Sequence, residues 1–274
     1  MSAGLLGDTS ARDYSAKLRQ FNLFAEPELV ALLESLQLQS GMQVFDAGCG
    51  TGEALCWLQR AVGEQGTVTG IDLAAAHVAA ARAAAPRARV LQGDLLTLVV
   101  PNSSFDLIWC VNTVHHLKDP VSALSRLRSA LRPQGRIAVG QSSLLPEMFL
   151  AWDARLERLT NEAVRQYYRD RYSLDERDLT AVRSLVGSLR AAGFTEVLPR
   201  TVVIERVSPL DPATDAYLRE TIFRDTWGER LKPYLSSADF AELSSLCDPQ
   251  HPQFALRRPD FHFLQSFTLA VAKN

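Results

Sequence analysis

The sequence has no excess of positive charge and no long apolar run. Its 29 Lys and Arg against 31 Asp and Glu give a formal net charge of −2, without a basic stripe. Affinity for nucleic acid comes mostly from clustered cationic side chains, so we expect no nucleic-acid partner. No stretch approaches the roughly 20 apolar residues that span a bilayer, and residues 1–8 do not resemble a secretory signal. We therefore expect a cytoplasmic protein without membrane insertion.

Cysteine is also scarce, and its spacing is not that of a metal site. The four cysteines, Cys49, Cys56, Cys110 and Cys247, lie within or beside apolar segments. Such positions are typical of buried, reduced thiols. No set of carboxylates has convincing metal spacing either, so we expect no metal.

Short apolar strands alternate with helical patterns between residues 41 and 140. Strands are expected at 43–47, 68–71, 89–92, 106–111 and 136–140, and helices at 53–62, 74–84 and 120–131. Two further strands are expected near 196–207 and 261–272. This rhythm predicts an α/β fold, a largely parallel sheet with helices on both faces.

The pattern divides the chain into four parts. Residues 1–40 predict N-terminal cap helices, with the helical pattern of 11–38 interrupted before Pro27. Residues 41–140 form the core, and 141–175 form a helical lid insert, in two pieces at about 149–160 and 163–171. Residues 176–274 complete the sheet and carry a second helical insert at about 208–260.

The most specific segment is a glycine-rich turn between a strand and a helix. Asp46 is followed by Gly48, Gly50 and Gly52, at alternate positions. Such glycines let a ligand touch bare backbone, and the following helix start suits an anionic group. The alternative is a loop that merely turns. The spacing differs from the dinucleotide fingerprint Gly-x-Gly-x-x-Gly, and Asp46 would repel a pyrophosphate but suits an ammonium group.

Carboxylates also end the next two strands. Asp72 ends the second strand and can accept both hydroxyls of a ribose, or it can serve as a helix N-cap. Asp94 follows the third strand, where it could accept an adenine amino group while the Leu95 N–H meets a ring nitrogen. The alternative for Asp94 is an ordinary surface loop.

Together these segments resemble the class I S-adenosylmethionine (SAM)-dependent methyltransferases, in the small-molecule branch similar to the ubiquinone/menaquinone C-methyltransferases. The matching segments are 46–52, 70–72, 93–94, 105–108, 115–120 and 131–135. The resemblance implies a Rossmann-like seven-stranded sheet with an antiparallel last strand. It also implies that SAM is bound by Tyr14, Asp46, Gly48, Cys49, Gly50, Gly52, Asp72, Leu73, Gly93, Asp94, Leu95, Val111 and Asn112. Tyr14 would lie near the methionine carboxylate, unless it is only a tyrosine on an amphipathic helix.

Catalysis is the least determined part of the prediction. His115 and His116 follow the fourth strand, and one of them is the candidate for a base or a substrate anchor. The alternative is that both only pack. Candidate pocket walls are Trp152, Tyr168, Tyr172, Phe223 and Trp227, which are equally consistent with helix packing.

We therefore expect methyl transfer to an O, N or C atom of a small, partly apolar acceptor, with S-adenosylhomocysteine (SAH) as the product. Three alternatives remain: the same scaffold catalysing a cyclisation or decarboxylation with bound SAM or SAH, a nicotinamide-dependent oxidoreductase, and a non-catalytic binding protein. The sequence leaves open whether the chain acts alone or as a homodimer.

Overall fold

The protein is built around one mixed β-sheet. The computed structural model describes residues 14–142, 148–149, 153–172 and 181–274. The strands are β1 Gln43–Ala47, β2 Thr67–Asp72, β3 Arg89–Gln92, β4 Phe105–Val111, β5 Leu131–Ser142, β6 Met148–Phe149, β7 Thr195–Val207 and β8 His262–Lys273. The helices are α1 Ser15–Glu34, α2 Glu53–Val62, α3 Ala75–Ala84, α4 Pro120–Ala130, α5 Ala154–Tyr172, α6 Ala181–Ala191, α7 Pro212–Ala216 and α8 Ser237–Cys247. Shorter or non-α turns are η1 Val114–His116, the π-helix η3 Tyr217–Trp227, η4 Gly228–Tyr234 and η5 Ala255–Arg257.

The strand order confirms the expected sheet. It runs β3-β2-β1-β4-β5-β8, with β7 on the far side of β8. Strands β1 to β5 pair in parallel, whereas β8 is antiparallel to both β5 and β7. The two-residue β6 pairs with β8 just beyond the end of β5. The last strand is therefore antiparallel, as the family resemblance implies.

Helices cover both faces of the sheet, because successive side chains of each buried strand point to opposite faces. On β1, Val44 packs in the cluster that contains α1, α2 and α3. Its neighbour Phe45 packs in the cluster that contains α4 and α6. Both side chains are almost fully buried, so the sheet is the middle layer of three.

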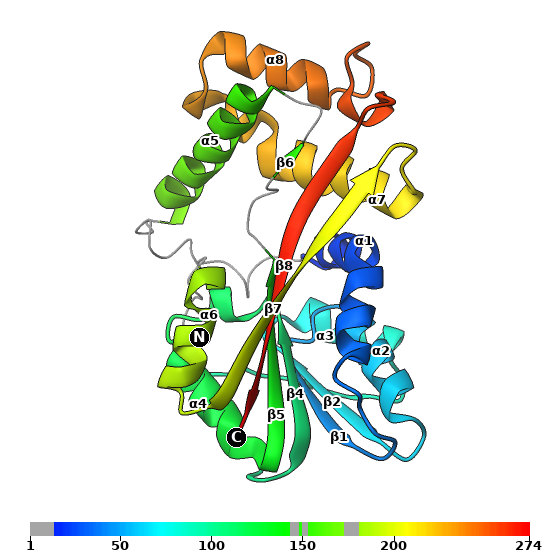
Figure 1. Cartoon of the computed structure of the whole chain (residues 1–274), viewed down its shortest axis with the longest axis vertical. Helices are drawn as coiled ribbons and strands as arrows, with labels where there is room; N and C mark the ends of the chain where they lie inside the picture. The colour runs from blue at the N-terminus through cyan, green and yellow to red at the C-terminus, as the bar shows by residue number, and fades with distance from the viewer. Residues whose placement is uncertain (1–13, 143–147, 150–152, 173–180) are drawn as a thin grey trace.

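A second tier of helices lies beyond the carboxyl ends of the parallel strands. Figure 1 shows α5, α7 and α8 in this tier, connected to the sheet by the long strands β7 and β8. The expected insert at about 208–260 corresponds to α7, η3, η4 and α8, which lie between these two strands. In the part of the chain that the structure describes, none of the helices is long and apolar enough to cross a membrane.

Two local expectations are corrected. The helical pattern does not break before Pro27, because α1 runs through it. A proline inside a helix costs about 3 kcal/mol, but α1 buries Phe24 and Leu29 on either side of it, and each such side chain contributes about 1.5–3 kcal/mol. The insert after β5 has one continuous helix, α5, rather than two pieces, and Phe149 lies in β6.

Candidate functional site

A cavity of about 700 Å³ lies at the carboxyl ends of β1 to β5. Each residue expected to bind the cofactor lines it, with the single exception of Gly52. His115, His116 and Tyr168 line it as well. Ligands of open α/β sheets bind at this edge, so the topology brings the expected residues to the expected place.

Of the aromatic residues expected in the pocket wall, only some line the cavity among the described residues. Phe223 and Trp227 are buried, stack on each other with ring centroids 5.3 Å apart, and do not line the cavity. Their role is therefore packing within the second tier. Trp152 and the side chain of Tyr172 lie outside the described residues.

At two positions of the turn, neighbouring atoms leave no room for a side chain, so only glycine fits. Gly48 has φ +89°, and a Cβ added there would lie 2.1 Å from Thr113 Oγ1. Gly52 has φ +94°, and its added Cβ would lie 2.8 Å from the Cα of Ala81 in α3. Gly52 therefore serves the packing of α2 against α3, and Gly48 shapes the cavity wall.

Asp46 presents an unsatisfied carboxylate oxygen. The residue is 2% exposed, and its Oδ2 has no hydrogen-bond partner among the described residues. Burial, and secondly the negative charge of Asp72, raises the pKa of Asp46 to about 8. Leaving such a group buried is costly, and a cation placed in the cavity would lower that cost.

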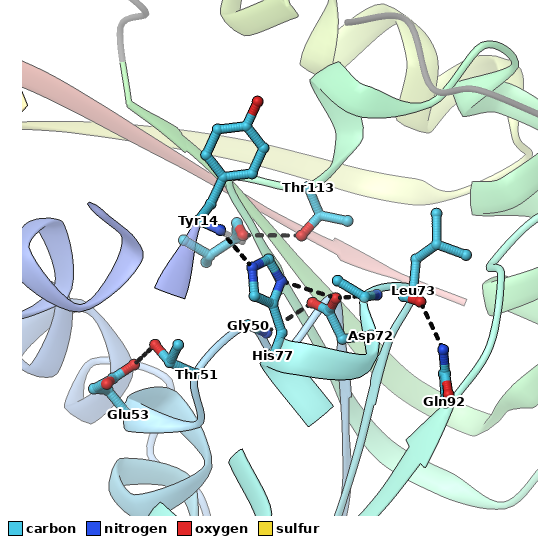
Figure 2. Close-up of polar contacts among 11 residues, drawn as sticks. Tyr14, Gly50, Thr51, Glu53, Asp72, Leu73, His77, Gln92 and Thr113 are labelled. Carbon is cyan, nitrogen blue, oxygen red and sulfur yellow. Dashed lines mark hydrogen bonds and ion pairs between the residues drawn. The ribbon is translucent and has the colours of Figure 1, made fainter. Parts of the chain in front are cut away.

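Asp72 connects the glycine turn to the N-terminal helix (Figure 2). Its Oδ2 accepts a hydrogen bond from the Gly50 N–H (3.0 Å), and its Oδ1 accepts one from the Ala74 N–H (2.9 Å). His77 Nδ1 lies 3.1 Å from the same Oδ1, and the Tyr14 N–H donates to His77 Nε2 (3.3 Å). Because Nε2 accepts, Nδ1 carries the proton and donates to Asp72.

The sequence interpretation missed His77, which is only 3% exposed. The usable signal was its position in the first turn of α3, five residues after Asp72. Side chains of a helix point back towards its N-terminus, so this residue reaches the end of β2. His77 thereby fixes the start of α1 over the Asp72 carboxylate.

The third carboxylate, Asp94, forms a tight turn after β3. Its Oδ1 accepts a hydrogen bond from the Leu96 N–H (2.9 Å). Both Asp94 and Leu95 line the cavity, at the end of the strand adjacent to β2.

His115 is held by a chain of amides. Its Nδ1 lies 2.8 Å from Gln141 Oε1, while Gln141 Nε2 donates to Asn112 Oδ1 (3.2 Å). Asn112 Oδ1 also accepts from the N–H and the hydroxyl of Ser142. Because these contacts fix the Gln141 amide, His115 Nδ1 is the donor and its Nε2 is left as an acceptor.

Both histidines are neutral near pH 7. The pKa of His115 is lowered to about 4, because burial, with a smaller contribution from the charge of Lys17, outweighs the rise from the Gln141 contact. The His116 ring lies 3.8 Å from that of His115. Burial and then the neighbouring His115 hold the pKa of His116 well below its usual value. Its Nδ1 has no hydrogen-bond partner among the described residues.

The far side of the cavity is formed by side chains that sequence reasoning did not single out. Its side chains come from α1, α5, the π-helix η3, η4 and β8, and include Lys17, Phe21, Tyr167, Ile222, Arg230 and Gln265. Over the described ranges, no three His, Cys, Asp or Glu side chains are grouped so as to hold a metal ion.

Comparison with known proteins agrees with this geometry. Residues 45–139 match the methyltransferase domain family. The 27-O-demethylrifamycin SV methyltransferase of Amycolatopsis mediterranei is 31% identical over 140 residues, which are 49% of this chain and 50% of that one. The nocamycin O-methyltransferase of Saccharothrix syringae is 29% identical over 233 residues, 80% of this chain and 82% of that one.

A solved structure shares the fold. The phosphoethanolamine N-methyltransferase 2 of Haemonchus contortus has a TM-score of 0.57 and 16% identity, over all of this chain and 60% of that one. The chain spans about half the length of several curated relatives that it matches, between 33% and 55% for four of them.

Proposed function

We propose that this chain, whose residues 45–139 match the methyltransferase domain family, is a class I SAM-dependent methyltransferase that transfers a methyl group from SAM to an O, N or C atom of a small molecule. One observation supports the proposal most: Asp46, which has an unsatisfied carboxylate oxygen, lines the same cavity as the glycine turn and two further strand-end carboxylates. That set suits a ligand with one ammonium, one carboxylate, a ribose and an adenine.

The residues present fit SAM. Asp46 would hold the ammonium, and the glycine turn with the start of α2 would face the methionine carboxylate beside Tyr14. Asp72 would accept a ribose hydroxyl, since a carboxylate has about four acceptor sites and its contacts to Gly50, Ala74 and His77 leave one of them open. Asp94 and the Leu95 N–H would bind the adenine, beside the backbone of 111–112.

SAM supplies an activated methyl group on a sulfonium, so the chain mainly has to orient the acceptor and exclude water. The acceptor would occupy the far side of the cavity, between α1, α5 and the π-helix η3. Phe21, Tyr168 and Ile222 on that side support a partly apolar acceptor.

The first test is the identity of the bound cofactor. Mass spectrometry of small molecules released by denaturation should detect SAM or SAH. At about 100 times the dissociation constant, either should stabilise the fold by about 2.7 kcal/mol, a rise in Tm of roughly 5–10 °C, whereas NAD should not. Stabilisation by NAD alone, or by none of the three, would contradict the proposal. An acceptor product without an added methyl would indicate the cyclisation or decarboxylation alternative.

We assign to His115 the role of a hydrogen-bond acceptor for the O–H or N–H of the methyl acceptor. Its Nε2 is unprotonated near neutral pH, but a pKa of about 4 makes it a weak base. His115→Phe should therefore lower kcat by about 10- to 100-fold, His115→Asn should lower it less, and SAH affinity should stay within about twofold.

The pH profile separates this role from that of a strong base. With an acceptor that does not itself titrate, kcat should be flat from about pH 6 to 9, because His115 stays neutral throughout. A rise of kcat through a pKa of 6 to 7 that disappears in His115→Phe would show that His115 acts as a strong base instead.

A further inference from the structure

The far side of the cavity contains two cationic side chains and one acidic side chain, that of Asp225. Lys17 comes from α1 and Arg230 from η4, and both line the cavity. Within the described part of the chain, neither makes a hydrogen bond or an ion pair. Arg230 does pack over an aromatic ring, with its Cζ 5.1 Å from the centroid of Tyr167. Both residues are half-buried, and a half-buried cation without an ion pair is unusual.

The local charges keep this side of the cavity positive. Burial, and then the charge of Arg230, lowers the pKa of Lys17, while Asp225 raises it. Asp225 is the acidic residue of this side, but its carboxylate is already paired with the exposed Arg224, with Nε 2.8 Å from Oδ1. The field of Lys17 also reaches the two histidines and lowers the pKa of each.

We propose that Lys17 and Arg230 bind an anionic group of the methyl acceptor. The acceptor is an amphiphilic acid: a carboxylate or another oxyanion meets the two cations, and an apolar or aromatic body lies against Phe21, Tyr167 and Ile222. This inference rests on the proposed function, since the acceptor has to share the cavity with the cofactor.

The position of Arg230 assigns it to the acceptor and not to the cofactor. Arg230 lies in the insert between β7 and β8, whereas the residues expected to hold the methionine carboxylate lie at the glycine turn and Tyr14. A guanidinium over an aromatic ring is also suited to a planar anion that can stack or form two parallel hydrogen bonds. Two cations disfavour an amine acceptor, which would carry like charge.

A pair of fluorescent probes tests the inference. 8-Anilino-1-naphthalenesulfonate carries a sulfonate on an aromatic body, and N-phenyl-1-naphthylamine has the same rings without the charge. In SAH-saturated protein, Lys17→Met and Arg230→Met should each weaken binding of the sulfonate by about tenfold or more, because a charged hydrogen-bond partner is lost. Binding of the neutral probe should change by less than about twofold.

Lys232→Met is the matched control, because Lys232 lies on the same turn η4 but is 65% exposed and pairs with Glu229. It should bind both probes as the wild type does. Thermal unfolding of each variant checks folding, and Lys17→Met should not be less stable, because burial already disfavours the ammonium. Lys17→Gln provides a second, polar neutral variant.

The inference is overturned if the sulfonate binds both cavity variants as tightly as the wild type, or if the neutral probe loses the same affinity. It is also overturned if Lys17→Met weakens SAH as strongly as the sulfonate, which would assign Lys17 to the cofactor carboxylate. Failure of SAH to bind the wild type would contradict the proposed function instead. The two probes can then still be compared in the ligand-free protein.

Discussion

Asp46→Asn is expected to stabilise the ligand-free protein and to weaken SAM binding at the same time. In the native protein the pKa of Asp46 is about 8, so at pH 7 this buried carboxyl is mostly protonated. In the unfolded chain it has its ordinary pKa of 3.8 and ionises, which favours unfolding. Asparagine cannot ionise, so the substitution removes this contribution, and Tm should rise by about 2–5 °C at pH 7.5.

The effect has a defined pH window. A carboxyl with a raised native pKa binds more protons in the folded state, so its contribution to stability falls as the pH rises from about 4 to about 8. The difference in Tm between Asp46→Asn and the wild type should therefore be largest near pH 8 and disappear near pH 4. Taking this difference removes the opposite trend from His115 and His116, whose lowered pKa values make the fold more stable as the pH rises towards their ordinary pKa of 6.5.

Whereas the Tm of Asp46→Asn should rise, its affinity for SAM should fall. An ammonium group that loses a charged acceptor loses about 1.5–3 kcal/mol, so the dissociation constant of SAM should rise about 10- to 100-fold. Calorimetry in buffers of different ionisation enthalpy should show that wild-type Asp46 releases a proton on binding below pH 8, and that Asp46→Asn does not. A variant with unchanged SAM affinity would remove Asp46 from the cofactor site.

Gly48→Ala is expected to damage both the fold and the cofactor site. At φ +89° a residue with a side chain pays about 1–2 kcal/mol in backbone strain. The added Cβ would also lie 2.1 Å from Thr113 Oγ1, and such overpacking costs about 1–3 kcal/mol more. We expect Tm to fall by about 6–12 °C and SAH affinity to fall at least 100-fold, because relief of the clash moves the cavity wall.

Gly41→Ala separates the two causes. Gly41 has almost the same backbone angle, φ +87°, but its added Cβ would have nothing within 4 Å. This control should therefore lose about 1–2 kcal/mol from strain alone and retain SAH affinity. Differential scanning calorimetry and titration with SAH measure both quantities. Equal losses in the two variants would mean that the contact with Thr113 contributes nothing.

The cofactor half of the protein was predictable because its signals are local. The strand at 43–47 and the helix at 53–62 were predicted with their observed bounds, since each is a short apolar run bounded by turn residues. The ends of parallel strands meet at one edge, so Asp46, Asp72 and Asp94 could be assigned to one site before any contact was known.

The features that the sequence did not predict correctly depend on tertiary packing. Pro27 was expected to break a helix, but burial on the sheet side outweighs its local cost, and no local pattern reports burial. Gly52 belongs to the same motif as Gly48 yet contacts α3 instead of the cavity, which depends on how α2 and α3 pack. Lys17 and Arg230 are more than 200 positions apart, so their shared cavity follows only from the tertiary fold.

The insert between β7 and β8 begins and ends at one place in the sheet. Val207 pairs with His262, and the Ser208 N–H donates to the Phe261 carbonyl (3.1 Å), so residues 208–261 leave and return at neighbouring backbone positions. The strands that carry the glycine turn and the three carboxylates lie elsewhere in the sheet. The length and sequence of the insert can therefore change without moving the strand ends that carry the glycine turn and the three carboxylates.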